Sequence, residues 1–118
     1  MASHSAFFLG FSLLLLHEMD AVRCREWRIF PGLSGLSDAW GKRLFFLVHI
    51  PIYYFMLVAL AGEASRPGFI RGMSLFMLVH GGLHLLFLWH PQNEFTDRGS
   101  WSIIAGAAAA GALELWVG

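Results

Sequence analysis

Five of the six histidines lie in or beside strongly apolar stretches of the chain: His17, His49, His80, His84 and His90. An imidazole ring binds protons or metal ions, and a polar group without partners in hydrocarbon is costly. Ionisable side chains that gather at one depth of a membrane therefore indicate a functional site. The histidines predict such a site within the apolar part of the chain.

The spacing of these histidines predicts pairs that share a helix face. His80 and His84 stand four residues apart, and His17 and Asp20 stand three apart, so each pair projects from one side of a helix. Two histidines at i and i+4 are the spacing with which helices chelate one metal ion. Asp20 offers an oxygen ligand, or a hydrogen bond to a liganding imidazole. We therefore predict a metal site made of His17, Asp20, His49, His80 and His84.

The donor types narrow the choice of metal and of reaction. Imidazole and carboxylate ligands suit zinc, iron or manganese, with copper as a further option. Cys24 is the single cysteine, which excludes an internal disulfide and a Cys-x-x-Cys metal site. A catalytic metal would activate water for hydrolysis, or bind oxygen to oxidise a lipid-soluble substrate. Glu18 and His90 would then transfer protons.

Two other functions fit the same histidines. The chain would be a b-type haem or quinone protein if His49 and His84 were axial ligands on different helices, with Gly81 and Gly82 leaving room for a planar cofactor. It would be a non-enzymatic membrane subunit if the histidines formed a hydrogen-bond network or a proton relay. A Soret band would identify the haem protein.

Several of these residues also have purely structural interpretations. Asp20 is three residues from Arg23, which is a suitable ion-pair partner. His90 precedes a proline at a helix end, where it would serve as a C-terminal cap. Glu18 would point toward an interfacial arginine. The polar loop at 93–98, which includes Glu94, would either fold under the site as a lid or remain solvated.

The elements that position these residues follow from composition. The chain has 118 residues, of which 57% are hydrophobic and 14% charged, and its mean hydropathy of +0.59 is typical of an integral membrane protein. The sequence has no basic patch with interleaved aromatic residues, so nothing in it indicates a nucleic-acid partner. We expect membrane lipids to surround the protein. Four apolar segments approach the length of about 20 residues that a membrane helix needs. We predict one all-α transmembrane domain over residues 1–118, an up-and-down four-helix bundle with spans at about 5–22, 44–62, 72–89 and 101–117.

The basic residues predict the orientation of this bundle. The first and third connections would share one side of the membrane and carry six basic residues, namely Arg23, Arg25, Arg28, Lys42, Arg43 and Arg98. The remaining connection carries Arg66 and Arg71. The positive-inside rule then places both long loops in the cytoplasm and both termini outside. At about 1.5 Å per residue, His17, His49 and His84 would lie roughly 7 to 11 Å inside the cytoplasmic boundary, with His80 one turn deeper.

Two further segments have predicted positions. The fourth span is rich in small residues, and Gly106 and Gly111 would let another helix approach closely. Glu114, near the far end of that span, would snorkel outward to water. The stretch 26–30, which contains Trp27, would lie at the membrane interface.

The segment His17-Glu-Met-Asp-Ala, followed by Glu26-Trp-Arg and the later histidines, resembles small bacterial four-helix membrane proteins of uncharacterised function. These proteins carry an H-E-x-D-A segment and a following E-W. The chain also looks distantly similar to the HXXEE-motif membrane proteins, with His17 and Asp20 matching the His and the first acid and Ala21 standing in place of the second. The resemblance implies a four-helix fold and a bacterial inner-membrane setting.

Overall fold

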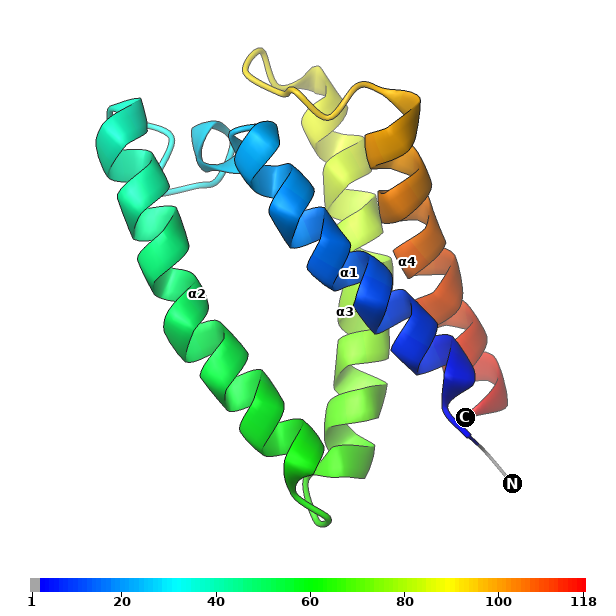
Figure 1. Cartoon of the computed structure of the whole chain (residues 1–118). Helices are drawn as coiled ribbons and strands as arrows, with labels where there is room; N and C mark the ends of the chain where they lie inside the picture. Colours follow the sequence, from blue (N-terminus) through cyan, green and yellow to red (C-terminus); the bar gives the residue numbers. More distant parts are fainter. Residues whose placement is uncertain (1–2) are drawn as a thin grey trace.

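The computed structural model describes residues 3–118, and within this range the chain forms four long α-helices (Figure 1). They are α1 (Ser5–Arg23), α2 (Asp38–Ala61), α3 (Arg66–Leu86) and α4 (Arg98–Val117). Two short 3-10 helices, η1 (Glu26–Arg28) and η2 (Phe87–Trp89), follow α1 and α3. Each of the four long helices is long and apolar enough to cross a membrane. The predicted all-α four-helix membrane fold is therefore confirmed.

The second, third and fourth helices begin several residues earlier than predicted, and polar side chains cap the second and the fourth outside their apolar spans. The Ser37 hydroxyl accepts a hydrogen bond from the Trp40 amide at 3.4 Å, at the start of α2. The Asp97 carboxylate accepts one from the Ser100 amide at 3.1 Å, at the start of α4. Serine and aspartate are favoured caps because their oxygens satisfy first-turn amides that have no partner within the helix. The third helix begins at Arg66, and Pro67 lies in its first turn, where proline is well tolerated.

Three of the helices pack closely, with α4 lying along both α1 and α3 (Figure 1). Glycine makes these approaches tight. A Cβ at Gly111 would lie 2.5 Å from the backbone oxygen of Ser74 on α3, and one at Gly10 would lie 2.8 Å from the Cβ of Ala110 on α4. The prediction that the fourth helix packs through small residues is confirmed.

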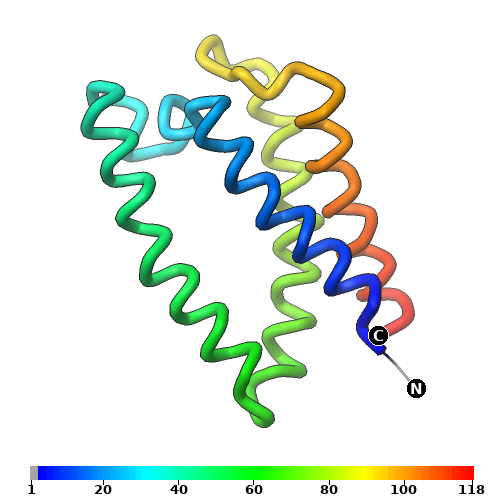
Figure 2. The backbone as a smooth tube through the Cα atoms, viewed as in Figure 1, coloured from blue at the N-terminus to red at the C-terminus, as the bar shows by residue number. Residues whose placement is uncertain are grey.

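The remaining helix, α2, leans away from α1 while meeting α3 at the hairpin that joins them (Figure 2). At this hairpin the Ser65 hydroxyl donates to the Ala59 carbonyl at 2.7 Å. The other end of α2 packs on η1, where Gly41 lies against the Trp27 ring and a Cβ would approach the ring to 2.6 Å. The helix is thus packed near its two ends, and between them its backbone stands apart from that of α1 (Figure 2).

The start of α1 and the end of α4 lie at one end of the bundle, and the connections α1–α2 and α3–α4 lie at the other (Figure 1). Within the stretch 26–30, which is predicted to lie at the membrane interface, two apolar side chains are buried in the protein. Trp27 and Ile29 are 4% and 3% exposed and belong to a core cluster with Phe45 and Phe95. They are buried because η1 folds back against the bundle instead of continuing outward from α1.

Glu114 also differs from its predicted position. Its side chain does not snorkel to water but is 4% exposed. One carboxylate oxygen accepts a hydrogen bond from the Phe7 amide at 3.2 Å, and the other lies 2.6 Å from Nδ1 of His4. Because first-turn amides have no partner within their helix, a carboxylate from α4 stabilises the start of α1.

Candidate metal centre

Three histidines and one glutamate meet near the C-terminal ends of α1 and α3: His17, Glu26, His80 and His84. Each offers one ligand atom, and the four atoms lie within 4.8 Å of one another. Nε2 of His84 lies 3.3 Å from Oε1 of Glu26 and 3.2 Å from Nε2 of His80. Nε2 of His17 lies 3.7 Å from the same Glu26 oxygen. Ligand atoms about 2.1 Å from one tetrahedral ion would be about 3.4 Å apart, so these separations fit a single metal ion.

Each member of the cluster is positioned by a different part of the fold. His17 projects from the last turns of α1, and His80 and His84 stand one turn apart on α3, as their spacing predicted. Glu26 comes from η1, beyond the end of α1. The chain reverses just before it, at Arg25, whose φ of 51° lies in the left-handed region. This reversal returns the Glu26 carboxylate to the histidines.

The residue after Glu26 anchors η1 in this position. Trp27 is buried, its ring packs on Gly41, and its indole nitrogen donates a hydrogen bond to Asp38 at 3.0 Å. Asp38 also accepts from Arg28, with a nitrogen–oxygen distance of 2.5 Å. The Glu26 backbone is therefore tied to the start of α2.

The histidines of the cluster are buried and incompletely satisfied by the protein. His17 is fully buried, and His84 and His80 are 2% and 9% exposed. Among the side chains of residues 3–118, four buried ring nitrogens have no hydrogen-bond partner: both nitrogens of His17 and Nδ1 of His80 and of His84. Buried polar groups are almost always paired, so unpartnered nitrogens are a reason to infer a bound species. One of these four atoms, Nε2 of His17, faces the Glu26 carboxylate, and a metal ion in the cluster would bind it.

Glu26 supplies negative charge to the cluster. Burial by itself would raise the pKa of this carboxyl group, but its contacts with His17 and His84 outweigh that effect and lower the pKa to about 2. The carboxylate is therefore ionised at neutral pH, which is the form that binds a divalent cation.

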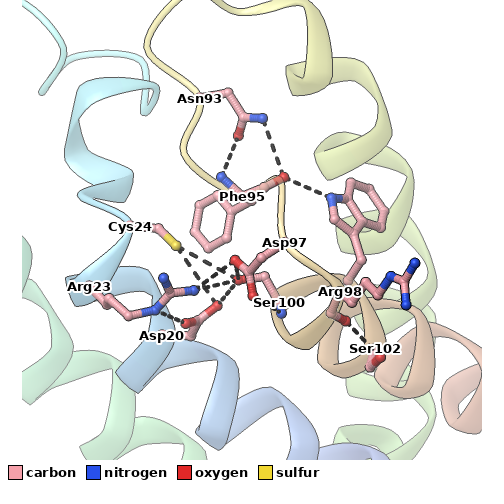
Figure 3. Close-up of polar contacts among 10 residues, drawn as sticks. Asp20, Arg23, Cys24, Asn93, Phe95, Asp97, Arg98, Ser100 and Ser102 are labelled. Carbon is pink, nitrogen blue, oxygen red and sulfur yellow. Dashed lines mark hydrogen bonds and ion pairs between the residues drawn. The ribbon is translucent and has the colours of Figure 1, made fainter.

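Phe95 covers the cluster from the side of the polar loops. Its ring is fully buried, with its centroid 4.6 Å from that of His84 and 5.3 Å from that of His17. The Asn93 carboxamide oxygen accepts from the Phe95 amide at 3.3 Å, and the Trp101 indole donates to the Phe95 carbonyl at 2.7 Å (Figure 3). The α3–α4 loop thus acts as a cover, and it does so through an aromatic ring rather than through its charged residues.

Asp20, predicted as a ligand, does not join the cluster. Its carboxylate accepts from the Arg23 guanidinium at 2.7 Å and from the Ser100 hydroxyl. Arg23 continues to Asp97 at 2.9 Å, and Figure 3 shows the resulting network between α1 and the start of α4. The alternative pairing with Arg23 is therefore the observed one, because Asp20 lies toward α4 while His17 faces α3. Cys24 lies beside this network, and burial raises the pKa of its thiol.

His49, also predicted as a ligand, lies away from the cluster because α2 leans outward. Its Nε2 is 2.5 Å from a carboxylate oxygen of Glu18, and its Nδ1 is 2.5 Å from the Phe45 carbonyl. Glu18, predicted to transfer protons, is thus paired with a histidine and not with an interfacial arginine. This pair is part of the wall of a cavity.

The remaining predicted positions are structural in this arrangement. Nδ1 of His90 accepts from the Gln92 amide at 3.1 Å, which caps the turn after η2 and leaves His90 outside the cluster. Glu94 forms an ion pair with Arg28 at 3.2 Å and does not join the cluster either. Gly81 packs closely against Ala108 of α4, whereas a Cβ at Gly82 would meet no atom within 4 Å.

A cavity of about 960 Å³ lies between α1, α2 and α3. Most of its walls are apolar, from side chains such as Ile52, Met56 and Phe76. Glu26 and His80 also line it, so the edge of the histidine cluster is reached from this cavity.

Sequence reasoning missed two members of the site, Glu26 and Phe95. From the sequence, Glu26 is assigned to an interfacial stretch and to a resemblance but not to the site, although an acid directly before a tryptophan, in a loop that must return to the bundle, indicates a side chain that is carried back to it. Phe95 stands among polar residues, where a lone apolar side chain indicates a residue that inserts into the core.

No curated protein and no solved structure shows significant similarity to the chain. One family model, described as a family of unknown function, DUF6713, matches residues 3–118. This match covers nearly the whole chain, including every residue of the cluster and its cover. The chain therefore belongs to the family of unknown function DUF6713.

Proposed function

We propose that this protein is an integral membrane metalloprotein that holds one divalent transition metal ion at His17, Glu26, His80 and His84. Three of the separations among the four ligand atoms, 3.2 to 3.7 Å, carry the proposal, since they match those around a single tetrahedral ion. All four atoms lie within 4.8 Å of one another. Zinc, iron and manganese suit three imidazoles and one carboxylate. A self-contained histidine network is less favoured, because Nε2 of His17 is buried at the cluster without a hydrogen-bond partner.

The metal centre is proposed to be catalytic and to act on a lipid-soluble substrate. Catalytic metal sites keep one position open for water or substrate. Glu26 and His80 line the apolar cavity, so exchange of one protein ligand would open the ion toward it. Zinc there would activate water for hydrolysis, whereas iron would bind oxygen for oxidation.

The proposed setting is the bacterial inner membrane, with both termini outside the cytoplasm. The first and third connections hold most of the basic residues and lie together at one end of the bundle, opposite the start of α1 and the end of α4. The metal centre would then lie toward the cytoplasmic leaflet. Reporter fusions at the two termini and in the α1–α2 loop test this orientation.

Metal analysis of the protein purified in detergent tests the proposal. We expect about one transition metal ion per chain, lost in the variant His84→Ala. His90→Ala is the matched control, because it removes an imidazole outside the cluster and should leave the metal content unchanged. A folded protein that carries no metal and takes up none from zinc, iron(II) or manganese would overturn the proposal.

A further inference from the structure

The four candidate ligands stand on two different parts of the fold. The three histidines belong to α1 and α3, and both of these helices pack closely on α4. A Cβ at Gly81, which is next to His80, would lie only 2.9 Å from the Ala108 side chain of α4. Glu26 lies on η1, outside these three helices. Close helix packing therefore fixes the histidines, and another contact must fix the glutamate.

The carboxylate of Glu26 depends on its own backbone for its position. Within residues 3–118 its ion-pair contacts are with His17 and His84, which are themselves members of the cluster. Carboxylates that bind metal ions are usually held by a further hydrogen-bonding group. Here the groups that could play this part contact the two residues that follow Glu26.

Asp38 is the residue that holds η1. The Trp27 indole donates a hydrogen bond to Oδ1 of Asp38 at 3.0 Å. The Arg28 guanidinium donates to both carboxylate oxygens, at 3.0 and 2.5 Å, a two-point contact that fixes its direction. Asp38 lies in the first turn of α2, so a single carboxylate of α2 anchors both residues that follow Glu26.

The helix that carries Asp38 is itself loosely attached to the other three. The buried residues of α2 are Gly41 and Phe45, both near its start, and further along its backbone stands apart from α1 (Figure 2). An element with few buried contacts moves more easily than a packed one. The start of α2 can therefore shift relative to α1, α3 and α4 more readily than these shift relative to one another, and η1 would shift with it.

We propose that Asp38 is a positioning residue of the metal centre, which holds the Glu26 carboxylate against the histidines through Trp27 and Arg28. This inference rests on the proposed function, because it concerns the same metal ion. Loss of the Asp38 contacts would withdraw Glu26 and leave three imidazoles with one position free, which is the ligand set of some catalytic zinc sites. Since Glu26 lines the apolar cavity, the free position would face that cavity.

Carboxyl footprinting of the full chain in detergent tests the positioning without any metal. A water-soluble carbodiimide and an amine convert accessible carboxyl groups to amides, and mass spectrometry then locates the labelled residues. The Glu26 side chain is 13% exposed, so it should react slowly in the unmodified protein. We expect Asp38→Ala to raise the labelling of Glu26 several-fold. Equal labelling of Glu26 in the two proteins would overturn the proposal.

Glu94→Ala is the matched control for this measurement. Glu94 is the other carboxylate that pairs with Arg28, at 3.2 Å, and it is 37% exposed where Asp38 is 50% exposed. It has no contact with Trp27, so its removal should leave the labelling of Glu26 unchanged. The same rise in both variants would show that Glu26 responds to any loss of charge beside Arg28, which contradicts the specific role of Asp38.

A double-mutant cycle tests the consequence for metal binding. Cobalt(II), whose visible absorption reports its ligands, is titrated into the unmodified chain, Asp38→Ala, Glu26→Gln and the double variant. We expect Asp38→Ala to weaken cobalt affinity several-fold and to shift the spectrum toward that of Glu26→Gln. The double variant should bind cobalt as Glu26→Gln does, because Asp38 acts through Glu26. Additive losses would indicate a general structural role for Asp38 and would overturn the proposal.

The two measurements separate this inference from the proposed function. An unmodified chain that binds no cobalt, zinc, iron(II) or manganese overturns the metal centre, and the footprinting still decides whether Asp38 holds Glu26. Bound metal with unchanged labelling of Glu26 overturns the role of Asp38 and leaves the metal centre standing. If Asp38→Ala does not fold, Trp27→Phe removes the indole hydrogen bond and keeps an aromatic ring beside Gly41. It should then change labelling and affinity in the same directions, and no change in either would contradict the proposal.

Discussion

Oε1 of Glu26 lies 3.3 Å from Nε2 of His84, which links the short helix after α1 to the last turn of α3. This contact brings the single carboxylate of the cluster from outside the membrane-spanning helices. Glu26 therefore offers the oxygen ligand beside the histidines, although Asp20 is closer to His17 in the sequence.

Replacing these two acids separates their roles. Glu26→Gln should weaken metal affinity by at least about tenfold, because an anionic ligand is replaced by a neutral amide. Asp20→Asn should retain metal but lower the unfolding temperature, because Arg23 and Ser100 lose a charged partner. Chelator competition and thermal unfolding in the same detergent measure the two effects. Metal loss in the Asp20 variant with full retention in the Glu26 variant would contradict this assignment.

Removing the aromatic cover should cost both stability and metal retention. Phe95→Ala deletes a fully buried ring and is expected to destabilise the fold by about 3 to 5 kcal/mol. It also admits water to His84, so metal transfer to a chelator should become faster. Phe46→Ala is the control, because Phe46 is 49% exposed on α2 and its removal leaves no cavity in the core. Similar losses in the two variants would show that Phe95 has no special role.

The close approach of α3 and α4 depends on Gly111. In Gly111→Ala the new methyl group would meet the Ser74 backbone oxygen, so the helices must separate, at a cost of about 1 to 3 kcal/mol. Gly82→Ala on α3 meets no atom within 4 Å and should be neutral or stabilising by up to about 1 kcal/mol. Chemical unfolding in mixed micelles measures the free energy of unfolding of the two variants. A Gly111→Ala variant as stable as the unmodified chain would show that α3 and α4 lie further apart at Gly111 than the 2.5 Å approach to the Ser74 oxygen indicates.

The Arg23–Asp97 ion pair should make stability depend on pH in the acid range. Hydrogen bonds from Arg23, and then from Ser100, hold the pKa of Asp97 well below its usual range. Its contribution is therefore complete above the ordinary carboxyl pKa of about 4 and is lost as the pH falls toward the lower folded value. Asp97→Asn preserves the cap of α4, since asparagine caps helices equally well.

Thermal unfolding of Asp97→Asn and of the unmodified chain measures this dependence. The variant should unfold at a lower temperature at about pH 7, and the difference should narrow as the pH falls below about 4. The pair is largely exposed, so the effect should be modest and should shrink with added salt. A difference that widens toward acid pH would contradict the assigned direction.

The sequence by itself determined the four apolar helices and the shared depth of His17, His80 and His84. Helix formation in apolar segments follows from their length and from the need to satisfy the backbone in hydrocarbon, which are local properties. The i, i+4 spacing likewise puts His80 and His84 on one face whatever the neighbours are. These features depend on the length, composition and residue spacing of each segment, which the sequence contains.

Only the tertiary structure decided which polar groups meet. The partners of Asp20 and His49 depend on how α1 is rotated toward α4 and how far α2 leans away, and helical periodicity contains neither quantity. The inclusion of Glu26 depends on one left-handed residue, Arg25, that reverses the chain after α1. Side-chain contacts between helices are set by packing at small residues and by loop geometry, which involve atoms far apart in the sequence. That is why the depth of the site was predictable and its exact set of ligands was not.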